Sequence, residues 1–104
     1  MTFHILLALA EGDRHGYAII QDVGARTNGE VRISAGTLYR SVQRMQEHGL
    51  IEESRRRPAA EEDDERRRYY RLTEFGTAVA RAEARRLTQL VKLARASGFA
   101  PGKA

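Results

Sequence analysis

Residues 34–50, SAGTLYRSVQRMQEHGL, decide the fold because they contain one helix together with the signals that begin and end it. Ser34 is a favourable N-cap residue, and Gly49 is placed to adopt the left-handed conformation that often follows a helix. The stretch therefore predicts a helix over about residues 35–48. Its apolar residues recur at helical spacing on one narrow arc, which must face the core: Leu38, Val42 and Met45.

The opposite arc of this helix is polar and suits the major groove of DNA. Arginine can donate two hydrogen bonds to guanine, and glutamine can pair with the adenine edge. Threonine and tyrosine hydroxyls often bind phosphate, and a helix N-terminus offers unpaired N–H groups. We therefore expect DNA contacts from the following residues: Ser34, Gly36, Thr37, Tyr39, Arg40, Gln43 and Arg44. Glu47 is on the same arc, but it lies too far along the helix to contact DNA.

Two simpler interpretations of this helix stay open. Its polar face could be an ordinary solvated face, and the ring of Tyr39 could pack on the preceding helix instead of contacting DNA. The neighbouring segments favour the DNA interpretation.

Weaker signals surround the central helix. Apolar spacing predicts helices over residues 2–10 and 16–27, and the β-branched alternation of residues 31–33 predicts a short edge strand. Two further strands are expected over residues 50–55 and 66–72. A long connection between two strands packed behind a helix is the outline of a wing.

The connection between these two strands is strongly charged. It carries two arginine triplets, which we expect to bind phosphates: Arg55, Arg56 and Arg57, then Arg66, Arg67 and Arg68. Clustered like charges are stabilised when an anion neutralises them. The five acidic residues 61–65 lie between the triplets, and they either pair with the arginines or form a tip that avoids phosphates. Alternation along the second strand directs Tyr70 to the core and Tyr69 outward.

Thr73 is the expected N-cap of a last helix that runs to about Ser97. The order of elements predicts a mainly α-helical fold with a small β wing. We expect a winged helix-turn-helix over residues 1–73, a long helix over residues 74–97, and a flexible tail over residues 98–104.

Composition limits the possible functions. The chain has 104 residues, a net charge of +4 and no cysteine. Its longest apolar run is too short to span a bilayer, so we expect a soluble, cytoplasmic protein. The histidines are scattered and the serines lack a nucleophile motif, so we expect no enzyme, metal site or cofactor. The basic balance favours an anionic partner.

Four motifs follow one another along the chain: His15-Gly16-Tyr17, Gly36-Thr37-Leu38-Tyr39, Glu47-His48-Gly49-Leu50-Ile51, and Arg67-Arg68-Tyr69-Tyr70-Arg71-Leu72-Thr73 with Gly76. In this order and spacing they resemble the PadR family of transcriptional regulators, over about residues 3–76. The chain is similar to the members with a small C-terminal region. The family often has proline where this chain has Arg40, which adds a candidate for base contact.

The resemblance implies a winged helix, a homodimer that binds double-stranded DNA, and usually repression of nearby genes. It also implies that the first and last helices build the dimer interface. We expect these interface residues: Phe3, Leu6, Leu7, Ala80, Ala84, Leu87, Leu90, Val91 and Ala94. Some relatives bind planar drugs between tryptophans, but this chain has none, so a small-molecule effector of another kind remains open.

Three alternatives differ in what the surface should show. A winged helix that acts as a protein–protein adaptor without DNA would expose apolar residues in place of Arg40, Gln43 and Arg44. A reader of single-stranded RNA needs an exposed aromatic platform, which the sequence lacks. A membrane-surface helix needs large apolar anchors, whereas the stripe on the last helix is rich in alanine.

Overall fold

Four helices and three short strands lie within residues 1–54 and 68–101, the part of the chain that the computed structural model describes. In chain order they are α1 (Thr2–Ala8), β1 (Arg14–His15), α2 (Gly16–Arg26), α3 (Ala35–Glu47), β2 (Ile51–Ser54), β3 (Tyr69–Leu72) and α4 (Glu74–Ala96). The mainly helical chain with a small sheet is the predicted fold class. None of the helices in these two ranges is long and apolar enough to cross a membrane.

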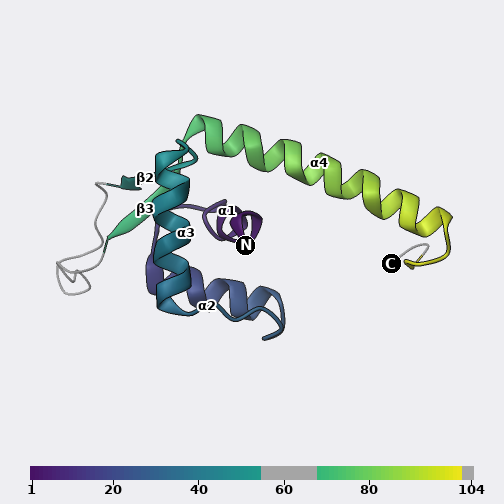
Figure 1. Ribbon diagram of the computed structural model, residues 1–104, viewed down its shortest axis with the longest axis horizontal. Coiled ribbons are helices and arrows are strands. Elements are labelled where there is room, and N and C mark those ends of the chain that lie inside the picture. The colour runs from purple at the N-terminus through teal and green to yellow at the C-terminus, as the bar shows by residue number, and fades with distance from the viewer. Residues whose placement is uncertain (55–67, 102–104) are drawn as a thin grey trace.

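The helices α1, α2 and α3 pack beside the sheet, and α4 leaves this body as a long arm (Figure 1). The molecule measures 52 × 28 × 24 Å as a result. The first part of α4 contacts α1, whereas its far end extends beyond the body. One apolar core lies between the elements and consists of Ile5, Leu6, Ala8, Leu9, Ile19, Val23, Ile33, Leu38, Val42, Met45, Leu50, Ile51 and Tyr70.

The helix α3 begins and ends at the two residues that its sequence signals predict. The Ser34 hydroxyl oxygen accepts a hydrogen bond from an N–H group of the first turn at 3.2 Å. At the other end, Gly49 has a φ of 75°. The Leu50 N–H then donates to the Met45 carbonyl at 2.9 Å, which is the longer-range bond of a Schellman motif.

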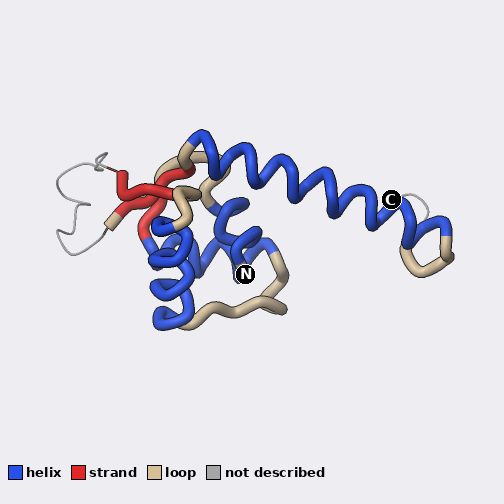
Figure 2. The backbone as a smooth tube through the Cα atoms, turned by 45° about the horizontal axis from the view of Figure 1, so that its top comes forward, coloured by secondary structure: helices blue, strands red, loops and turns tan. Residues whose placement is uncertain are grey.

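The sheet is antiparallel, in the order β1-β3-β2, and lies at one end of the helical body (Figure 2). The prediction of a strand at residues 31–33 was wrong, because this segment is irregular. Ile33 still reaches the core, and the Val31 N–H is satisfied by the Thr27 hydroxyl at 3.0 Å. The third strand is instead β1, which occupies the free edge of β3.

Tyr70 and Tyr69 point to opposite sides of β3, as alternation predicts. Tyr70 is 3% exposed and belongs to the core. The half-buried Tyr69 meets the ring of His15 edge-on, with the ring centroids 5.4 Å apart. His15 also caps α2, because its Nδ1 atom accepts the Ala18 N–H at 3.1 Å. These contacts join the sheet to the first turn of α2.

Gly16 lets α2 and α3 cross at close range. A Cβ atom at this position would lie 2.8 Å from the Tyr39 hydroxyl oxygen and 3.1 Å from the side chain of Leu38. Both distances are shorter than comfortable contacts between side chains. The first turn of α2 is therefore seated directly against α3.

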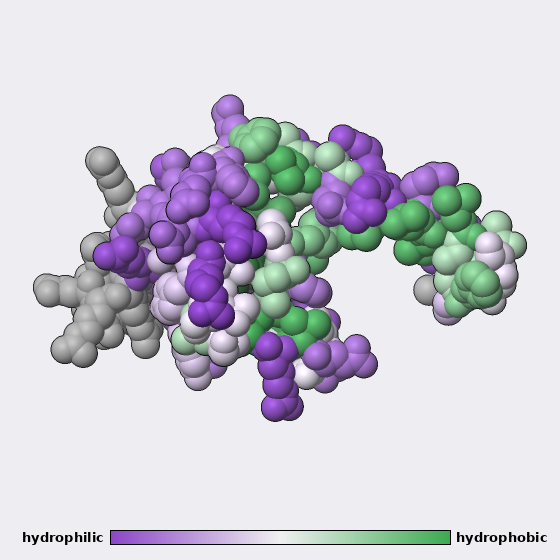
Figure 3. All heavy atoms as spheres, in the orientation of Figure 1, coloured by the Kyte–Doolittle hydropathy of each residue, from purple (hydrophilic) through white to green (hydrophobic). Residues whose placement is uncertain are grey.

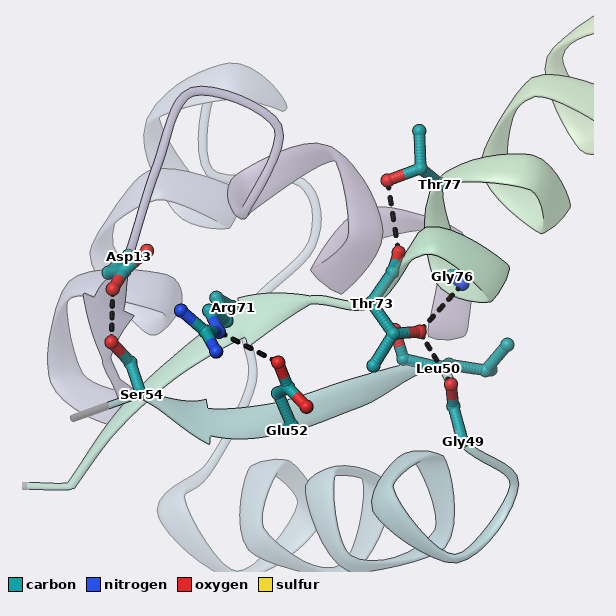
Figure 4. A network of polar contacts seen from close by, with 9 residues as sticks. All are labelled: Asp13, Gly49, Leu50, Glu52, Ser54, Arg71, Thr73, Gly76 and Thr77. Atoms are coloured by element: carbon teal, nitrogen blue, oxygen red, sulfur yellow. Dashed lines mark hydrogen bonds and ion pairs between the residues drawn. The ribbon is translucent and has the colours of Figure 1, made fainter. Parts of the chain in front are cut away.

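The first turn of α4 is anchored on the C-terminal end of α3 (Figure 4). The Thr73 hydroxyl donates toward the carbonyl oxygens of Gly49 and Leu50, at 2.6 and 3.1 Å. The Thr73 N–H also donates to Leu50, and the Gly76 N–H donates back to the Thr73 hydroxyl oxygen at 2.9 Å. A Cβ atom on Gly76 would lie 1.9 Å from the Leu50 carbonyl oxygen. We call these four residues the α3–α4 joint.

Gly76→Ala tests this close approach. The added methyl group would overlap backbone atoms, so the free energy of unfolding should fall by about 3 kcal/mol or more. The matched control is Gly24→Ala in α2, where a Cβ atom meets nothing within 4 Å. This control should stabilise the chain by about 0.5–1 kcal/mol, because alanine is the better helix former. Equal stability of both variants in urea denaturation would contradict the close contact between Gly76 and Leu50.

Burial raises the pKa of the Tyr70 hydroxyl, as does the nearby Tyr39, while Arg68 acts in the opposite direction. The unfolded chain releases this proton near the ordinary pKa of tyrosine, which is about 10. The folded chain still keeps the proton at that pH. Its contribution to the free energy of unfolding is complete below that pH and is lost as the pH rises toward the raised pKa. Tyr70→Phe should therefore give a flatter stability profile above about pH 10. Denaturation at a series of pH values measures both slopes, and identical slopes would contradict this assignment.

Candidate nucleic-acid interface

The outer face of α3 presents polar side chains to solvent, whereas its inner face is in the core. Leu38, Val42 and Met45 are at most 2% exposed. Arg40, Gln43 and Arg44 are exposed, and with Glu47 they line a shallow hollow on the surface. The structure therefore separates the two faces as the helical wheel predicts, and it brings the three candidates for base contact together.

The N-terminal turn of α3 carries a row of linked polar groups. The Ser34 hydroxyl donates to the Thr37 hydroxyl oxygen at 3.1 Å, in addition to its role as N-cap. An Nη2–H group of Arg40 donates to the same Thr37 oxygen at 3.4 Å. A guanidinium has five N–H donors, so this single contact holds Arg40 in place while other donors stay available.

Gly36 has no neighbour among the described residues that explains why it lacks a side chain. It is exposed, and a Cβ atom would meet only the Arg40 guanidinium at 3.5 Å, which is an ordinary contact. Open space over the helix backbone at this point allows another molecule to approach closely.

Tyr39 packs on the preceding helix with one part of its side chain and is exposed with another, so both interpretations of this residue stay open. Its hydroxyl end rests against the position where Gly16 lacks a Cβ atom, so the ring packs on the preceding helix. The side chain is nevertheless 51% exposed. The exposed part lies beside the polar face of α3.

At the base of the wing, Arg68 is exposed at the start of β3. The other five arginines predicted to bind phosphate lie outside the described residues, as does the acidic run: Arg55, Arg56, Arg57, Arg66 and Arg67. Among the described residues, Arg71 forms an ion pair with Glu52 across the two strands at 2.8 Å. The Ser54 hydroxyl donates to the Asp13 carboxylate, which ties β2 to the turn before α2 (Figure 4).

Sequence reasoning did not find the Glu52–Arg71 and Asp13–Ser54 contacts. The first follows from strand register, because Glu52 lies opposite Arg71 in the ladder. The second joins residues 41 positions apart, and no local pattern indicates it. Within the described residues no group of three or more histidine, cysteine or acidic side chains is placed to hold a metal ion.

The residues expected at a dimer interface lie in three situations. Leu6 is 2% exposed and is part of the core, while Phe3 and Ala80 are partly buried against it. Exposed positions are Leu7, Ala84, Leu90 and Val91, and intermediate positions are Leu87 and Ala94. Leu93 and Phe99, which are not among the predicted interface residues, are 55% and 87% exposed. Figure 3 shows hydrophilic side chains gathered over α3 and hydrophobic surface along α4 to its far end.

Known proteins share this arrangement. The family model "Transcriptional regulator PadR-like family" matches residues 5–82. An uncharacterised protein of Lysinibacillus sphaericus is 36% identical over 88 residues, which cover 85% of this chain and 72% of that protein. A transcriptional regulator from Clostridium thermocellum has a TM-score of 0.75 and 26% identity, and the match covers 90% of this chain and 85% of that one.

PadR of Bacillus subtilis, solved in complex with operator DNA, has a TM-score of 0.67 and 17% identity. That match covers 80% of this chain and 45% of that one, and at this identity it concerns the fold alone. The winged helix predicted from the sequence is confirmed by these structures. With three quarters of its length matched by the family model, the chain belongs to the PadR-like family of transcriptional regulators.

Proposed function

We propose that this chain is a sequence-specific DNA-binding repressor that acts as a homodimer on an inverted-repeat operator. The observation that carries the proposal is the outer face of α3, where Arg40, Gln43 and Arg44 are exposed together on a helix whose other face is buried. Family membership supports the regulatory role, and the likeness in fold to a relative solved with operator DNA supports the mode of binding.

In this proposal α3 is the recognition helix, and its N-terminal half enters the major groove. Arg40, Gln43 and Arg44 contact base edges, because their donors and acceptors match those of guanine and adenine. Ser34, Gly36, Thr37 and the exposed part of Tyr39 face the phosphates, and the absence of a side chain at Gly36 lets the backbone approach a strand closely. The arginine triplets 55–57 and 66–68 bind phosphates beside each half-site.

Two copies pair through their long helices, which form a dimerisation element over residues 74–97. The apolar residues left exposed on α4 support this pairing, since a single chain leaves Leu90, Val91 and Leu93 each more than 40% exposed. The two recognition helices then meet successive major grooves about 34 Å apart. Residues 1–73 are the DNA-binding unit, and residues 98–104 are a C-terminal tail.

In the bacterial cytoplasm, the dimer binds its operator on the nucleoid DNA and represses transcription by occupying the promoter. An effector, where one exists, acts by changing the distance between the two recognition helices. A protein–protein adaptor is the competing function, and the charged outer face of α3 argues against it because apolar residues would be expected there.

Salt-titrated binding separates these functions. The purified chain should bind its own upstream DNA more tightly than scrambled DNA of equal length, with a steep dependence on salt concentration. Arg40→Ala should lose about 1–3 kcal/mol on the preferred site and little on scrambled DNA. Arg86→Ala is the matched control, because it removes the same charge from an exposed position on α4 where Arg86 pairs with Glu83.

Comparison of the two variants separates the loss of a base contact from the loss of one positive charge. The control should keep the preference between the two DNAs. An equal loss on every sequence in Arg40→Ala would show that Arg40 does not contact bases. Absence of binding by the unmodified chain, even at low salt, would favour the adaptor.

A further inference from the structure

The α3–α4 joint connects the proposed recognition helix to the proposed dimerisation helix directly. In the sequence, the whole wing separates these two helices. In space, Thr73 spans the connection by itself, because its hydroxyl reaches the carbonyl oxygens of Gly49 and Leu50 while it accepts the Gly76 N–H. Figure 4 shows these bonds meeting at one side chain. The first turn of α4 is thus tied to the end of α3 as well as to β3, and α4 also packs on α1.

The geometry of the joint leaves little freedom. The Leu50 carbonyl oxygen is contacted by the Thr73 N–H and hydroxyl and occupies the space where Gly76 lacks a Cβ atom. Leu50 is itself fixed, because its N–H closes the Schellman motif of α3 and its side chain is in the core. These contacts therefore fix how the first turn of α4 is seated against the end of α3.

A tilt at this joint is amplified along α4. The helix has 23 residues, which at a rise of about 1.5 Å per residue makes it about 34 Å long. A rotation of about 6° at the joint moves the far end by about 3.5 Å, close to the rise of about 3.4 Å per base pair along DNA. Two exposed apolar residues, Leu93 and Phe99, lie at that far end.

We propose that the α3–α4 joint fixes the separation of the two recognition helices in the dimer, and so selects the spacing between the half-sites of the operator. Thr73 is a positioning residue in this role, since it acts through the direction of α4 and touches no base. The inference rests on the proposed function, because it concerns the same dimer on the same DNA.

A spacer series tests the proposal. Once footprinting of the upstream DNA has located the operator, its two half-sites are placed one or two base pairs closer or farther apart. The unmodified chain should lose affinity by roughly tenfold or more for a change of one base pair, because that change also rotates one half-site about the duplex axis. Thr73→Val, which removes the hydroxyl at nearly constant shape, should lose less than about threefold.

Two variants control for a general loss of stability. Thr73→Ser keeps the hydroxyl and should restore the steep dependence on spacing. Thr88→Val makes the same chemical change on the exposed face of α4, where the hydroxyl bonds only to the Ala84 carbonyl one turn earlier. Because Thr88 lies within the proposed dimerisation element, the expected result concerns spacing alone: this variant should keep the steep dependence on spacing. A uniform loss of affinity in Thr73→Val, with the spacing preference unchanged, would overturn the proposal and leave the proposed function intact.

A measurement without DNA examines the joint itself. The chain contains no cysteine, so spin labels can be placed at the exposed positions Gln43→Cys on α3 and Gln89→Cys on α4. Labelled chains are diluted with unlabelled chains so that only distances within one chain are measured. The distance distribution should be narrow in the parent and in Thr73→Ser, and broad or shifted in Thr73→Val.

Negative results in the two measurements contradict different proposals. A distribution in Thr73→Val as narrow as that of the parent, at the same distance, would overturn the proposed joint whatever the protein binds. Loss of the sequence preference in the unmodified chain, with the label result as expected, would overturn the proposed function and the spacing role with it.

Discussion

A backbone contact between Gly76 and Leu50 holds α4 against the end of α3, and the other elements are arranged around it. The carbonyl oxygen of Leu50 lies where any other residue at position 76 would carry a Cβ atom. Leu50 also begins the connection into β2, and Thr73 follows directly after β3. The helix α3, the strands β2 and β3 and the arm α4 therefore converge on a few backbone atoms. This contact acts together with the packing of α4 on α1 to hold α4 at its angle to α3.

Three glycines near the recognition helix separate into structural and functional positions by the same criterion. At Gly16 and Gly76 a Cβ atom would meet atoms of the chain at 2.8 and 1.9 Å, so internal packing accounts for both. At Gly36 the space is open and the φ angle is not positive, so neither packing nor backbone conformation requires glycine. In the proposed complex, a DNA strand that comes close to the backbone at the N-terminus of α3 would account for a glycine here.

The sequence predicts well what neighbouring residues decide. The caps at Ser34 and Thr73 and the terminator at Gly49 depend on bonds within three to five residues, and all three form as expected. The opposed faces of α3 follow from its period. Residues 31–33 have the composition of a strand but remain irregular, and the edge of β3 is occupied by β1 instead. The α3–α4 joint could not be predicted from the sequence either. The motif that contains Gly76 does not show which distant carbonyl group lies against this glycine.

The exposed apolar surface of α4 lies mainly on the part of the helix that extends beyond the body. One side of its first turns lies against the body, where Val79 and Ala80 pack against the core, while Phe75 is 58% exposed. Beyond them the helix projects into solvent with Leu90 and Leu93 about half exposed. Helices gain most of their stability from packing of an apolar face, and the pairing proposed above would supply such packing for this arm. In a twofold dimer the partner surface is the same on both copies, and Leu7 of α1, which is also exposed, is a further apolar residue that such a copy could cover. In the proposed dimer, an arm fixed at one end by backbone contacts and completed at the other by a second copy would convert the geometry of the joint into the distance between two DNA-binding faces.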